Sequence, residues 1–139
     1  MSAAPKDVSQ PQVVDSSLRY WAFISYSHRD RKWGDWLHRA IETYRVPKAL
    51  VGNGIPARVF PVFRDREELA GAVDLTARIE TALAESRNLI VICSPRSAAS
   101  RWVNEEIRRF AHSGPADRIF AFIIDGEPNA AADEAEANW

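Results

Sequence analysis

The sequence has a single cysteine, few glycines and no long apolar run among its 139 residues. One cysteine excludes an internal disulfide and a cysteine-based zinc cluster, and it fits a reducing compartment. The longest apolar stretches, near residues 88–93 and 119–124, fall far short of the ~20 residues that a membrane-spanning helix needs. We therefore expect a cytoplasmic chain whose domain makes no contact with a membrane.

Charge is nearly balanced as well, with 18 basic and 19 acidic residues and a formal net charge of −1. No electrostatic field favours nucleic acid, so we predict no nucleic-acid partner. The length suits one domain, which we place at residues 19–128. Residues 1–18 have the composition of a flexible leader, and the alanine-rich, acidic residues 129–139 form a tail or the start of a truncated remainder.

Strand-like and helix-like patterns alternate along this domain. Strands are predicted at residues 20–25, 58–63, 88–93 and 118–124, and helices at residues 33–44, 74–85 and 100–112. The first helix has an apolar stripe formed by Trp33, Trp36, Leu37, Ala40, Ile41 and Tyr44. Pro61 cannot donate a ladder hydrogen bond, which favours an edge position for the second strand.

Such alternation predicts an α/β fold, a doubly wound parallel sheet of the flavodoxin-like kind in three layers. In that strand order, ligands bind outside the carboxyl ends of the first and third strands, where the order reverses. The expected crevice is lined by residues 26–28 after the first strand and by residues 94–106 after the third.

Within this crevice, Trp102 and Glu106 stand four residues apart on one face of the predicted helix. An indole for stacking and a carboxylate that stabilises developing positive charge suit the cleavage of a glycosidic bond to a flat heterocycle. An aromatic residue at helical spacing is equally typical of a core. Glu105 points about 100° away round the helix, so we expect it to be a solvated charge.

Four segments resemble, in order and spacing, the conserved boxes of Toll/interleukin-receptor (TIR) domains, particularly those of bacteria and plants. They are Phe23 to Ser27, Phe63 to Gly71, Ser94-Pro95 and Trp102 to Ile107. The resemblance implies the flavodoxin-like TIR fold and self-association through the BB loop after the second strand. In this chain the loop comprises Arg64, Asp65, Arg66, Glu67, Glu68 and Gly71. Ala70 stands where the family often has proline, and the family's last strand and helix are not apparent after Pro128.

For the enzymatic members of the family, the resemblance implies that Glu106 cleaves the nicotinamide–ribose bond of NAD+ and that Trp102 contacts the substrate. The expected products are nicotinamide and linear or cyclic ADP-ribose, with NAD+ as substrate and with no cofactor and no metal. Further candidates for substrate binding are Tyr26, Ser27, His28 and Arg29. Ser27 is equally suited to cap a helix, and His28 and Arg29 are equally typical of a solvated surface. Activation by self-association in bacterial defence or stress signalling is the implied setting.

Other classes of function compete with this hypothesis. A non-enzymatic TIR adaptor that works by domain contacts alone remains the alternative. A phosphoacceptor receiver is excluded because its third strand must end in an acidic residue, whereas this one ends in Cys93-Ser94. A dinucleotide oxidoreductase is excluded because no glycine-rich loop follows the first strand. Cys93 is predicted to be a core residue, and His38 and His112 to be surface residues.

Overall fold

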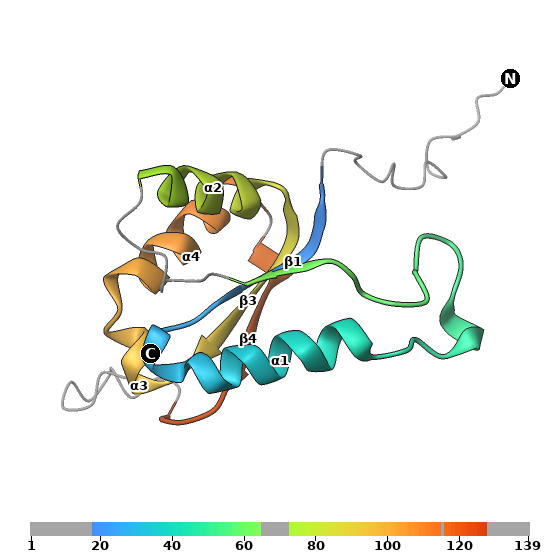
Figure 1. Cartoon of the computed structure of the whole chain (residues 1–139), viewed down its shortest axis with the longest axis horizontal. Helices are drawn as coiled ribbons and strands as arrows, with labels where there is room; N and C mark the ends of the chain where they lie inside the picture. The colour runs from blue at the N-terminus through green and yellow to red at the C-terminus, as the bar shows by residue number, and fades with distance from the viewer. Residues whose placement is uncertain (1–17, 65–72, 115, 128–139) are drawn as a thin grey trace, which may run out of the picture.

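The computed structural model describes residues 18–64, 73–114 and 116–127, without the side chains of residues 73–75. Its centre is a parallel sheet of four strands (Figure 1), namely β1 (Tyr20–Ser25), β2 (Val62–Arg64), β3 (Ser86–Cys93) and β4 (Ile119–Ile123). The strand order is β2-β1-β3-β4, with all neighbours parallel. This order confirms the flavodoxin-like prediction and puts the switch point between β1 and β3.

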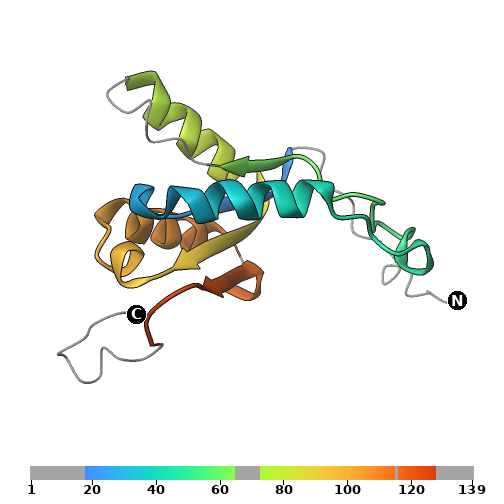
Figure 2. The same cartoon turned by 60° about the horizontal axis from the view of Figure 1, so that its bottom comes forward.

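Helices cover both faces of this sheet. They are α1 (Arg31–Thr43), α2 (Val73–Ala84), α3 (Pro95–Ala98) and α4 (Arg101–Ser113), with the short 3-10 helices η2 (His28–Asp30), η3 (Lys48–Leu50) and η5 (Ala116–Arg118). In Figure 1, α2 and α4 lie on one side of the strands and α1 lies on the other. Figure 2 shows α1 crossing its face of the sheet. The three predicted layers are therefore present.

Side-chain alternation along the strands divides the core into two clusters. Phe23 and Leu89 pack against α2 and α4, whereas Ala22 and Ile24 pack on the side of α1. Because successive strand residues face opposite ways, Ser25 at the end of β1 points to the side of α4. The last residue of β1 therefore lies on the face of the sheet that α2 and α4 cover.

The second strand is shorter than predicted, because it begins only at Val62. Pro61 has no N–H to donate, although its carbonyl accepts a 2.9 Å hydrogen bond from the Trp21 N–H. The predicted edge position of this strand is confirmed by the strand order. Glu42 on α1 accepts the Val62 N–H at 2.8 Å.

The apolar stripe predicted for α1 is only partly buried. Leu37 is in the core, but Trp33, Trp36 and Tyr44 are 44%, 55% and 55% exposed. The two indoles pack against Phe122 of β4, with ring centroids 6.1 and 6.3 Å away. The predicted amphipathic helix is confirmed, and its tryptophans lie near β4, the edge strand opposite β2.

Three side chains were assigned from sequence to the surface or to the core, namely His38, Cys93 and His112. The prediction for His38 was wrong: it is half-buried, and its Nε2 lies 2.8 Å from the Val62 carbonyl oxygen, which joins α1 to β2. The core prediction for Cys93 is confirmed, because the residue is 4% exposed and burial raises the pKa of its thiol to about 11. His112 is exposed, as predicted.

None of the described helices is long and apolar enough to span a membrane.

Candidate active site

Helix α4 carries the candidate catalytic carboxylate. The helix begins after Ser100, whose Oγ accepts the Val103 N–H at 3.1 Å. Val103, Glu106 and Phe110 form its buried face, at spacings of three and four residues. Glu106 therefore places a carboxyl group in an otherwise apolar stripe, and only 3% of the residue is exposed.

A serine from the sheet meets this carboxylate. Ser25 ends β1, is fully buried and donates a hydrogen bond of 2.6 Å from Oγ to Glu106 Oε1. A hydrogen bond to an ionised oxygen is short and about twice as strong as a neutral one. The contact fixes the Glu106 carboxylate at the carboxyl end of β1, which is the edge where ligands bind in this type of sheet.

Glu105, the neighbour of Glu106, has the opposite environment. Its side chain is 43% exposed and pairs with Arg108 at 2.6 Å and with Arg109 at 3.3 Å. These contacts confirm the prediction that Glu105 is a solvated charge. One helical step therefore separates a surface ion pair from a buried carboxylate.

Trp102 lies one turn before Glu106 and is half-buried against the cluster of Phe23 and Leu89. The core alternative is thus correct for the buried part of the indole. Stacking of its remaining surface on a substrate stays a prediction.

The four candidate substrate-binding residues after β1 lie in different environments. Ser27 is buried and its Oγ accepts the Arg29 N–H at 3.2 Å, so it caps η2 as the alternative had it. His28 and Arg29 are exposed. Tyr26 is 3% exposed in the cluster on the side of α1, so close to Gly34 that a Cβ there would lie 3.0 Å from its ring. The structure thus places Tyr26 in the core on the face opposite Ser25, and not in an open crevice.

A polar cluster that the sequence analysis did not identify lies at the same edge. The Asp30 carboxylate accepts hydrogen bonds from Ser94 Oγ and Arg96 Nε, both at 2.6 Å. Arg96 Nη1 also lies 3.5 Å from Asp125 Oδ2, after β4. The hydrogen bond to Asp30 is the main reason that the pKa of the Arg96 guanidinium is raised above its ordinary value.

Sequence signals for this cluster were weak. Ser94 and Ser97 form a capping box for α3, with Pro95 in its first turn, a pattern that marks a helix start. The helix is only one turn long and was not predicted. Asp30 and Arg96 are 66 positions apart, so only the folded chain brings them together.

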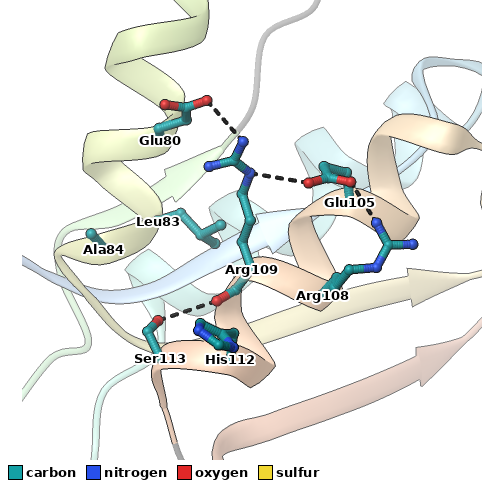
Figure 3. A pocket seen from close by; sticks show the side chains of 8 residues that line it. All are labelled: Glu80, Leu83, Ala84, Glu105, Arg108, Arg109, His112 and Ser113. Atoms are coloured by element: carbon teal, nitrogen blue, oxygen red, sulfur yellow. Dashed lines mark hydrogen bonds and ion pairs between the residues drawn. The ribbon is translucent and has the colours of Figure 1, made fainter.

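A groove of about 410 Å³ lies elsewhere, between α2 and α4 (Figure 3). Glu80, Glu105, Arg108 and Arg109 line it in a row of ion pairs, together with Leu83 and His112. It includes Glu105 and not Glu106. Exposed pairs of this kind contribute little to binding or stability by themselves.

The predicted assembly loop is described only at its start. Arg64 at the end of β2 is half-buried and pairs with the Asp35 carboxylate of α1. The other predicted members, Asp65, Arg66, Glu67, Glu68 and Gly71, lie outside the described residues, as do most of the leader and the tail. Within the described ranges, no group of three or more histidine, cysteine or acidic side chains is placed to hold a metal ion.

The described residues thus combine a parallel α/β sheet in flavodoxin-like order with a buried glutamate one helical turn after a tryptophan. The chain belongs to the TIR domain family, whose profile matches residues 22–139. It is 34% identical over 111 residues to the NAD(+) hydrolase ApTIR of Actinoplanes sp., and 30% identical over 113 residues to Protein toll of Drosophila melanogaster. Each match covers 79% of this chain but only 15% and 9% of those relatives.

Proposed function

We propose that this TIR domain hydrolyses NAD+ at the nicotinamide–ribose bond, with Glu106 as the catalytic residue and NAD+ consumed as a substrate, without a separate cofactor. The observation that carries the proposal is the Glu106 carboxylate itself, held by Ser25 at the carboxyl end of β1. The similarity to a bacterial NAD(+) hydrolase supports it. A cytoplasmic location, with which the single cysteine is consistent, is part of the same proposal.

The proposed reaction needs one negatively charged group, the Glu106 carboxylate. The bond between ribose C1′ and nicotinamide N1 breaks, and its electron pair moves to N1, which neutralises the pyridinium. The ribose becomes an oxocarbenium-like cation, which the Glu106 carboxylate stabilises. Water then adds to C1′ and releases a proton, giving ADP-ribose. If an adenine nitrogen adds in place of water, the product is cyclic. Nicotinamide leaves as a neutral molecule and is a good leaving group, so no acid is needed to protonate it.

Burial of Glu106 bears on regulation. A carboxylate that is 3% exposed reaches a ribose only after neighbouring side chains move. We therefore propose that the single chain is a resting form and that self-association opens the site, in a defence or stress response. The alternative is an adaptor in which the contact between Ser25 and Glu106 serves packing alone.

Release of nicotinamide, measured by chromatography over a rising series of protein concentrations, tests the proposal. We expect the parent chain to release nicotinamide, more per molecule at high concentration, and the variant Glu106→Gln to be slower by about 100-fold or more, the usual effect of removing such stabilisation. Glu105→Gln is the matched control and should keep the parental rate. No release by a folded parent chain at any concentration would favour the adaptor.

A further inference from the structure

Asp30 joins the two segments that follow β1 and β3. It is only 4% exposed, and both of its carboxylate oxygens are engaged, Oδ2 by Ser94 Oγ and Oδ1 by Arg96 Nε. Both donor–acceptor distances are 2.6 Å. These are short, charge-assisted hydrogen bonds, the kind that fixes geometry most strictly.

The partners of Asp30 belong to segments that flank the candidate site. Asp30 closes η2, directly after His28 and Arg29, and stands before the first residue of α1. Ser94 is the N-cap of α3 and Arg96 lies inside it. Because α4 starts only three residues after α3 ends, the position of α3 constrains the start of the helix that carries Glu106.

Arg96 extends the connection to a third segment. Its Nε binds Asp30 while its Nη1 approaches Asp125, in the turn after β4. The planar guanidinium offers donors in a fixed fork, which an ammonium group cannot reproduce. Asp30 and Arg96 therefore set the spacing of three segments at the carboxyl edge of the sheet.

Stability alone is a poor explanation for this arrangement. Burying a carboxylate carries a large desolvation penalty, and apolar residues of similar volume often hold a fold at least as well. A buried ionic contact can supply a defined geometry, and the edge of a sheet that binds a ligand requires one.

We propose that Asp30 is a positioning residue of the active site. Through Ser94 and Arg96 it holds the turn of His28 and Arg29 at a fixed distance from Trp102 and Glu106. The inference rests on the proposed NAD+ hydrolysis and adds a requirement to it: the two walls of the site must stay in register for the substrate to be bound and oriented.

Steady-state kinetics of nicotinamide release test this role, with rates expressed per folded molecule. The variants are Asp30→Asn, which keeps the shape and loses the charge, and Arg96→Lys, which keeps the charge and loses the fork. The control is Arg108→Lys, which alters an ion pair of the same 2.6 Å length on the surface of α4. We expect kcat/KM to fall about 10- to 100-fold in the first two variants, as for a misplacement of about 1 Å, with a higher KM as part of the loss. The control should be unchanged.

A merely structural role would give a different pattern. The folded fraction would fall, while kcat and KM per folded molecule would stay at parental values, and that result overturns the positioning role. An equal loss in Arg108→Lys overturns it as well. If Asp30→Asn folds poorly, Arg96→Lys decides, because Arg96 is partly exposed. A folded parent chain that releases no nicotinamide refutes the proposed function together with this inference, whereas an active parent with unaffected variants refutes only the inference.

Discussion

Two sets of polar contacts, which we call the buried and the exposed network, differ in burial more than in contact distance. At the carboxyl edge of the sheet, Glu106 and Asp30 are 3% and 4% exposed and accept hydrogen bonds of 2.6 Å. On the groove between α2 and α4, Glu105 and Arg108 also approach to 2.6 Å, with side chains 43% and 70% exposed. Contact distance therefore does not distinguish the two sets, whereas burial does, because water screens the exposed pairs more strongly.

This difference bears on where function lies. An exposed ion pair can form, break and be replaced by water with little change in free energy. A buried acceptor that loses its donor cannot form a hydrogen bond with water instead, so breaking the contact lowers the stability of the fold. The buried network therefore specifies positions, whereas the row of charges in Figure 3 is a solvated surface.

The largest expected effect on stability comes from removing Asp30. The substitution Asp30→Ala strands the Ser94 hydroxyl and removes the buried partner of Arg96, which is partly exposed and can regain water. We expect the free energy of unfolding to fall by about 2 to 3 kcal/mol, the range for hydrogen bonds to a charged group. Urea denaturation measures it. A loss below about 0.5 kcal/mol would put Asp30 in the same group as the surface pairs.

Removing the Ser25 hydroxyl should have a smaller effect. Ser25→Ala keeps the backbone of β1 and takes away the donor to Glu106 Oε1. We expect a loss of about 1 to 2 kcal/mol in the free energy of unfolding, because a buried acceptor loses its bond. The same urea titration of the double variant Ser25→Ala/Glu106→Gln gives the coupling between the two residues. Strictly additive losses would contradict a direct contact.

Alkaline pH should weaken the buried edge through Cys93. Burial raises the pKa of this thiol from 9.0 to about 11. The unfolded thiol therefore ionises first, so the stabilisation is complete below pH 9 and is lost as the pH rises from 9 to 11. We expect about 1.4 kcal/mol of extra loss at pH 10 in the parent relative to Cys93→Ala, at one pH unit above the unfolded pKa. Parallel pH dependences of the two chains would refute this.

The smallest effect is expected at the exposed network. Arg109 pairs with Glu80 at 3.3 Å and with Glu105 at 3.3 Å. Arg109→Gln should lower the free energy of unfolding by about 0.2 to 1 kcal/mol, and the difference should shrink in high salt. Urea titrations at low and high ionic strength measure it. A larger, salt-independent loss would show that the two networks do not differ as we describe.

Local patterns in the sequence predicted most of the fold. Apolar runs predict β3 and β4, and helical periodicity predicts α4, because both patterns are set by residues close together in the sequence. All three elements lie within a few residues of the predicted bounds. The exposure of Trp33 and Trp36 depends on where α1 packs, which periodicity does not determine.

The candidate site could be predicted only in part. Glu106 was predicted from its four-residue spacing to Trp102 on one helical face and from the resemblance to TIR domains. Its hydrogen bond from Ser25 spans 81 positions, and the contact of Asp30 with Arg96 spans 66. Pairings at such separations arise from the order of the strands, which fixes which loops meet but not which side chains bond.

The most direct test of the account is to locate bound NAD+ on the folded domain. Backbone amide shifts of the Glu106→Gln variant, recorded by NMR during a titration with NAD+ at a protein concentration at which the parent chain releases nicotinamide, report the binding surface without turnover. We predict that the largest changes fall in residues 25–30 and 94–106, at the carboxyl edge of β1 and β3. Changes confined to the groove of Leu83, Arg109 and His112 would contradict the central claim that the buried edge is the active site.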